Sequence, residues 1–171
     1  KQMPISIKEV QLFKENLPFK LTNAQERTIK EISDDISLAK PMRRLVQGDV
    51  GSGKTVVAAV SMYISAKNNT QSVLLCPTEV LAEQHFKNFS AWFKNSNINI
   101  ELLTGKMPIS KRRGIYQDLE DGVIDILIGT HAVFQDKVKM KNLGLVVVDE
   151  QQRFGVKQRF DLVKKSSDQI M

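Results

Sequence analysis

The stretch QGDVGSGKTVVAAV, residues 47–60, crowds glycines around a lysine and a threonine, directly ahead of an apolar run. Gly48, Gly53, Lys54 and Thr55 match the spacing G-x-x-x-x-G-K-[ST] of a phosphate-binding loop. Glycines let successive backbone N–H groups turn toward one anion, and the helix expected next points its positive N-terminal end at the same anion. A chance glycine turn is the weaker alternative, since strand, loop and helix follow in the required order. The predicted nucleotide-binding residues of this loop are Gly48, Asp49, Val50, Gly51, Ser52, Gly53, Lys54 and Thr55.

A second acidic motif completes the predicted site. In LGLVVVDEQQ, four apolar residues precede Asp149, which predicts a buried strand with a carboxylate at its carboxyl end. Open α/β sheets bind their ligands at that edge. We expect Lys54 to neutralise the β- and γ-phosphates, Thr55 and Asp149 to hold Mg²⁺, and Glu150 to act as a base on the attacking water. No NKxD sequence of the guanine-reading type occurs, so ATP is the expected nucleotide rather than GTP.

Composition limits the class of protein. The 171 residues suit one domain, and the net charge of +6 is compatible with a nucleic-acid partner without requiring one. Neither a leader peptide nor a membrane-spanning segment is evident, which favours a cytoplasmic location.

The order of segments predicts an α/β fold. Residues 1–17 are read as a lead-in helix or linker, and residues 18–171 as the domain proper. Thr22 and Gln25 have the spacing of a helix capping box, and Pro41 ends the helix that follows. Short apolar runs then alternate with helical patterns, which is typical of a mainly parallel sheet with helices on both faces. The expected strands are 44–47, 72–76, 98–103, 125–129 and 145–149, and the expected helices between them include 78–95 and 108–122.

Six motifs in one order extend this prediction to a family: LPFKLTNAQ (17–25), RLVQGDVGSGKT (44–55), PTEVLAEQH (77–85), TGK (104–106), GTHAVFQ (129–135) and DEQQRFGVKQR (149–159). The chain resembles the first RecA-like motor domain of superfamily 2 helicases. Within them it is most similar to the RecG family of bacterial branched-DNA helicases. The Mfd family of transcription-repair coupling translocases shares much of the pattern and is the nearest alternative.

The resemblance implies further site residues. Phe19, Thr22 and Gln25 resemble the motif that reads adenine, although Gln25 also suits a helix cap alone and Phe19 a hydrophobic staple. The motifs that contact the DNA backbone in the family lie, as in this chain, at strand ends. The nucleic-acid-binding residues implied in this way are Pro77, Thr78, Glu79, Thr104, Gly105, Gly129, Thr130 and His131.

One position departs from the family pattern. Gln152 stands where the acidic motif usually has histidine, whose role with the following arginine, Arg153 here, is to couple the nucleotide and DNA sites. Glutamine forms hydrogen bonds but takes no proton near neutral pH, so we expect no pH sensitivity from this position. The resemblance also implies three partners: branched or forked DNA, a second RecA-like domain that supplies arginines to the ATP site, and an upstream DNA-recognition domain. A non-catalytic ATP-binding scaffold or switch is the alternative from another class.

Overall fold

A computed structural model describes residues 7–18, 20–37, 44–48, 54–134 and 138–149. Its centre is one five-stranded sheet in the order β1-β5-β2-β4-β3, and every neighbouring pair is parallel. The expected strands are therefore confirmed, with ends shifted by a few residues. The strands are β1 (Arg44–Gly48), β2 (Gln71–Leu75), β3 (Ile100–Leu103), β4 (Ile126–Gly129) and β5 (Leu143–Asp149).

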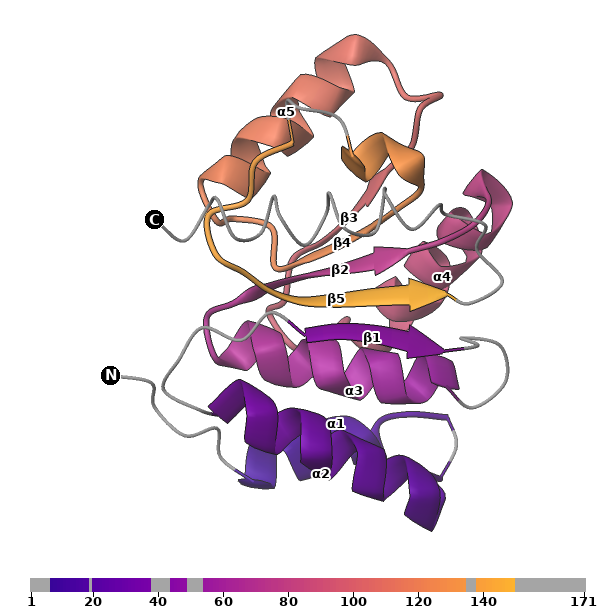
Figure 1. The fold of residues 1–171 in the computed structure, drawn as a ribbon, viewed down its shortest axis with the longest axis vertical. Helices are drawn as coiled ribbons and strands as arrows, with labels where there is room; N and C mark the ends of the chain where they lie inside the picture. The colour runs from indigo at the N-terminus through magenta and orange to yellow at the C-terminus, as the bar shows by residue number, and fades with distance from the viewer. Residues whose placement is uncertain (1–6, 19, 38–43, 49–53, 135–137, 150–171) are drawn as a thin grey trace.

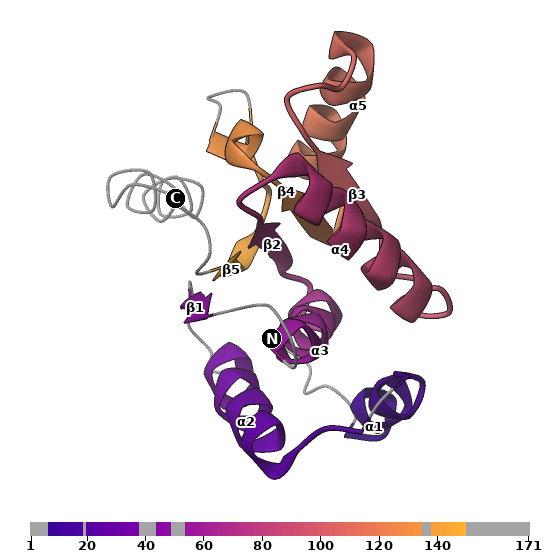
Figure 2. The same ribbon diagram turned by 90° about the vertical axis from the view of Figure 1, so that its right-hand side faces the viewer.

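Helices cover both faces of the sheet, as predicted. Viewed onto the tips of the strand arrows, α1 to α4 lie on one side and α5 with the short η1 on the other (Figure 2). None of the helices among the described residues is long and apolar enough to span a membrane. The helices are α1 (Ile7–Glu15), α2 (Asn23–Ser37), α3 (Lys54–Lys67), α4 (Glu79–Trp92), α5 (Ile109–Glu120) and the 3₁₀ helix η1 (His131–Phe134).

Side-chain alternation along the strands divides the core into two clusters. On β2, Val73 and Leu75 belong to the cluster beneath α5 and η1, whereas Leu74 packs with α3 and α4. Successive residues of a strand point to opposite faces, and all five residues of β2 are buried. An almost continuous apolar run is the form that a strand takes when both its faces are covered.

The first helix packs onto the domain through aromatic rings. Phe13 of α1 stacks on Tyr63 of α3 with ring centroids 4.3 Å apart and lies 4.7 Å from the ring of Phe93. Phe13 is 5% exposed, so α1 contributes directly to the core. The boundary at residue 17 between a lead-in segment and the domain stays a prediction, although this packing favours one unit.

Candidate nucleotide site and strand-end loops

The predicted phosphate loop lies between β1 and α3. β1 ends at Gly48, and α3 begins at Lys54. Gly48 is the register partner of Asp149, the last residue of the neighbouring strand β5. The backbone therefore brings the start of the glycine motif and the acidic motif, about a hundred residues apart in sequence, to adjacent positions at one edge of the sheet (Figure 1).

Burial holds the helix after the loop in place. Ala59, Val60 and Met62 of α3 have no exposed surface, and Ser61, 1% exposed, donates its hydroxyl to the Val57 carbonyl at 2.7 Å. A helix buried on nearly every side keeps a fixed axis, so its N-terminus keeps one position relative to β1 and β5. Thr55, in the first turn of α3, is partly exposed. This fits a hydroxyl that bound Mg²⁺ and phosphate can approach.

Several predicted residues lie outside the described residues. They are Phe19 of the adenine motif, loop residues Asp49, Val50, Gly51, Ser52 and Gly53, the predicted base Glu150, and the coupling pair Gln152 and Arg153. For Lys54 and Asp149 the structure gives the backbone position only. The roles assigned to these residues therefore stay predictions.

The capping box predicted from Thr22 and Gln25 is formed. The Thr22 N–H donates to Gln25 Oε1 at 2.8 Å, and the Gln25 N–H donates to Thr22 Oγ1 at 3.2 Å. This reciprocal pair confirms the helix cap. Thr22 ends the connection between α1 and α2, Gln25 lies in the first turn of α2, and this connection lies on the same side as the tips of the strands (Figure 1).

A hollow of about 530 Å³ lies beside this cap, with Leu17, Leu21 and Glu26 among its lining residues. Lys14 also lines this hollow, and its Nζ forms an ion pair with Glu26 Oε2 at 2.7 Å. Because Gln25 Oε1 is already occupied by the cap, reading of adenine by that side chain stays a prediction.

The loops predicted to meet DNA come together at the same edge of the sheet. Gly129 is in register with Leu75 of β2 on one side and with Leu103 of β3 on the other. The Cys76 N–H donates to the Gly129 carbonyl at 2.8 Å, which ties the exits of β2 and β4. The three predicted motifs, at 77–79, 104–105 and 129–131, thus form one continuous rim.

Exposure differs sharply within these motifs. Thr78, Gly105 and His131 are exposed, but Thr104 is 4% and Thr130 2% exposed. The Thr78 hydroxyl accepts the Leu81 N–H at 3.2 Å and so caps α4, which leaves its own hydrogen available to a second acceptor. Of the three threonines in these motifs, only Thr78 is exposed, and its contact with a nucleic-acid backbone stays a prediction.

Close packing accounts for the glycine at 129. A Cβ built there meets the Leu103 carbonyl oxygen at 2.6 Å and Val133 Cγ2 at 2.8 Å. No real Cβ tolerates such approaches to backbone, so β3, β4 and η1 require a glycine at this position whatever it contacts outside the protein. Beside it, the buried Thr130 Oγ1 makes no hydrogen bond within the described part of the chain.

An ion pair that sequence reasoning did not identify joins two of the loops. Lys106 Nζ lies 3.4 Å from Glu79 Oε2, which links the loop after β3 to the first turn of α4. The motif TGK contains this lysine, but the prediction assigned only Thr104 and Gly105. A lysine directly after a predicted phosphate-facing Thr-Gly pair was the available signal.

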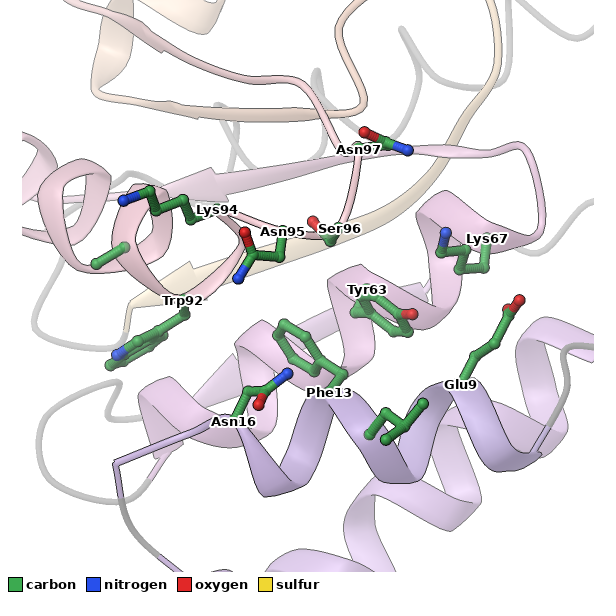
Figure 3. Close-up of a pocket in the computed structure, with 12 residues that line it drawn as sticks. Glu9, Phe13, Asn16, Tyr63, Lys67, Trp92, Lys94, Asn95, Ser96 and Asn97 are labelled. Atoms are coloured by element: carbon green, nitrogen blue, oxygen red, sulfur yellow. The ribbon is translucent and has the colours of Figure 1, made fainter.

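A second hollow lies away from these loops. Its volume is about 510 Å³, and it opens between α1, the last turns of α3 and the segment after α4 (Figure 3). Lys67 lies over the Tyr63 ring at 5.6 Å, and Trp92 and Lys94 form another part of the rim. α3 begins at the edge with Gly48 and ends here, so this hollow belongs to the opposite edge of the sheet. None of the predicted site residues lines it.

The strand order, the β1–α3 connection and the acidic end of β5 define a P-loop nucleotide-binding domain with the RecA-like fold. More narrowly, a family model for DEAD/DEAH box helicases matches residues 22–170, and the chain belongs to this family.

Curated relatives confirm the narrower resemblance. The chain is 52% identical over 151 residues to the ATP-dependent DNA helicase RecG of Aquifex aeolicus, covering 88% of this chain and 19% of the relative. It is 48% identical over 155 residues to RecG of Synechocystis, covering 91% and 19%. A solved structure of RecG bound to a three-way DNA junction superposes with a TM-score of 0.78 at 45% identity, covering 90% of this chain and 21% of that one. The chain thus spans about a fifth of the length of the relatives it matches.

Proposed function

We propose that this chain is the ATP-binding part of a DNA helicase motor that couples ATP hydrolysis to the remodelling of branched DNA in repair and recombination, in the bacterial cytoplasm. The observation that carries the proposal is the register of Gly48 with Asp149 beside the start of α3. This juxtaposition puts the glycine motif and the acidic motif at one ligand edge. The RecG relatives support the choice of DNA as partner, because they are DNA helicases and the solved RecG structure is bound to a three-way DNA junction.

In this proposal the chain's residues divide the work on ATP. Backbone N–H groups of residues 48–53 and the N-terminus of α3 hold the phosphates, and Lys54 neutralises the charge that develops on them. The Thr55 hydroxyl and Asp149 would hold Mg²⁺, which would supply positive charge that offsets the charge of the phosphates. Glu150 orients and deprotonates the attacking water. Residue 55 lies in the first turn of α3, and residue 149 is the last residue of β5. These backbone positions are compatible with one ion shared by the two residues.

The remaining parts of the motor belong to the rest of the protein. A second RecA-like domain closes over the nucleotide and contributes arginines, and a DNA-recognition domain upstream selects the branch. Loss of an arginine finger lowers phosphoryl-transfer rates by about 10³–10⁵-fold. The isolated chain should accordingly bind Mg·ATP weakly and hydrolyse it very slowly.

ATP hydrolysis by the full-length protein tests the proposal. Rates are measured without DNA, with linear duplex and with a three-way junction of the same length and base composition. Stronger stimulation by the junction is the expected result. Equal stimulation by linear duplex would point instead to a translocase of the Mfd type, and ATP binding without stimulation by any DNA would point to a nucleotide-dependent scaffold.

A further inference from the structure

The pair formed by Lys106 and Glu79 joins two loops of the rim that faces the proposed DNA path. Their charged atoms are 3.4 Å apart, and their side chains are 87% and 22% exposed respectively. A Cβ on Gly105 would lie 3.8 Å from Glu79 Oε1, so the carboxylate rests over the backbone of the Thr-Gly-Lys loop. The exposed Thr78, which precedes Glu79, lies next to this pair in sequence.

The two partners are held very differently. Glu79 is partly buried and lies in the first turn of α4, where the positive end of the helix favours a negative charge. Lys106 is a long, almost fully exposed side chain on a loop. Ion pairs of this exposure stabilise proteins little, and lysine has three donors to share. Glu79 is therefore the fixed partner, and Lys106 is free to move to a stronger acceptor.

We propose that Lys106 contacts a phosphate of the nucleic-acid backbone. When DNA binds, the Lys106 ammonium leaves the Glu79 carboxylate and pairs with a phosphate instead. We call this exchange of partners the latch. The inference rests on the proposed function. In the free protein Lys106 neutralises a carboxylate that would otherwise repel phosphate at this rim. In the complex Lys106 binds a phosphate oxygen, and Glu79 opposes tighter binding because its charge is then uncompensated.

Salt-dependent binding by the full-length protein tests the latch. The probe is a fluorescein-labelled synthetic three-way junction, titrated between low and moderate salt with wild type, Lys106→Gln, Glu79→Gln and the double variant. Lys94→Gln, an exposed lysine after α4 at the opposite edge of the sheet, is the matched control.

Loss of one phosphate contact lowers the slope of log K against log salt by about 0.9 for duplex DNA. We expect Lys106→Gln to show this change and to weaken binding up to about fivefold at low salt. Glu79→Gln should tighten binding, and the double variant should bind better than Lys106→Gln alone. Lys94→Gln should match wild type.

Two results would overturn the latch. If Lys106→Gln keeps the wild-type slope, Lys106 makes no phosphate contact. If Glu79→Gln weakens binding as much as Lys106→Gln, the pair only holds the two loops together. If the wild-type protein still binds the junction, either result contradicts the latch alone and not the proposed function. If the wild-type protein binds no DNA, the proposed function itself is wrong.

Discussion

The sheet differs between the side where its strands begin, the amino edge, and the side where they end, the carboxyl edge. At the amino edge, buried polar groups bond to one another: the Gln71 amide donates to the carbonyls of Leu119 and Ile124 at 3.0 and 2.9 Å, and its oxygen accepts the Asn142 N–H at 2.8 Å. At the carboxyl edge, Thr78 and Lys106 are exposed and keep donors available. Buried hydrogen bonds fix the strands at the amino edge, whereas the carboxyl edge, where we propose that ligands bind, has exposed donors.

This difference teaches how to separate stability from function in the chain. A substitution of an exposed side chain in the strand-end loops of the carboxyl edge should change binding or turnover while leaving the fold intact. A substitution at the amino edge should loosen the fold and affect activity only through the amount of folded protein. Each prediction below tests one side of this division.

The largest expected effect is at Lys54. Lys54→Ala should lower the ATPase kcat of the full-length, DNA-stimulated protein by at least about 10²–10³-fold, because a preorganised positive charge on the transferring phosphoryl group is lost. The thermal unfolding midpoint should not change. Steady-state hydrolysis and a thermal melt of the same preparations measure both.

Glu150→Gln gives the companion test of the same site. It should abolish turnover while ATP binding, followed with a fluorescent ATP analogue, is largely kept. Lys94→Ala removes an exposed lysine from the opposite edge and should leave hydrolysis unchanged. Turnover that survives Lys54→Ala or Glu150→Gln would refute the catalytic assignment.

The next largest effect is expected at the amino edge. Gln71 is 4% exposed, and Gln71→Ala removes the partner of the Ile124 carbonyl and of the Asn142 N–H, while the Leu119 carbonyl still accepts the N–H groups of Gly122 and Lys141. We expect the free energy of opening of β2 and β4 to fall by about 2–4 kcal/mol. Hydrogen exchange of the backbone amides of these strands in the full-length protein measures it.

The control for Gln71 is Gln117, an exposed residue of α5 whose amide donates to Asp121 directly after the helix. Gln117→Ala should change exchange protection by less than about 0.5 kcal/mol. If Gln71→Ala lowers ATP turnover per folded molecule, the division between the two edges is wrong.

Sequence periodicity predicted the strands and helices because both faces of the sheet are covered, which makes β4 and β5 nearly continuous apolar runs. The positions of Gly48 and Asp149 at strand ends were predictable from the sequence, whereas the pairing of β1 with β5 that puts them in register was not. Burial of Thr104 and Thr130 was not predictable, since it depends on neighbours in other strands. The contact of Lys106 with Glu79 was equally hidden, because it joins residues far apart in the chain.

A smaller effect separates the two roles of the capping box. Thr22→Ala removes the hydroxyl that accepts the Gln25 N–H and should destabilise α2 by about 1 kcal/mol. Gln25→Ala should show a similar loss and, if Gln25 reads adenine, should also raise the KM for ATP and reduce the preference for ATP over GTP. Hydrolysis of the two nucleotides by both variants measures this. An unchanged preference in Gln25→Ala would leave the helix cap as its whole role.

The smallest effect is expected at Asp125, at the amino edge. Burial raises the pKa of this carboxyl, and the Asn99 N–H, which donates to Asp125 Oδ2 at 2.9 Å, together with the charge of Lys67 only partly offsets the rise. The folded state therefore holds the proton more tightly than the unfolded chain. The stability from this group is complete below the ordinary pKa of 3.8 and is lost as pH rises through the raised folded-state pKa.

Asp125→Asn keeps an oxygen that accepts from Asn99 but removes the ionisation. Relative to wild type, the variant should gain thermal stability as the pH rises from below the ordinary pKa of 3.8 toward neutrality. Thermal melts of both proteins across that range measure the difference, and exposed Asp118→Asn controls for the lost charge. A wild-type advantage that grows with pH would mean that the Asn99 bond outweighs burial, and the amino edge would then use this carboxylate as a stabilising charge.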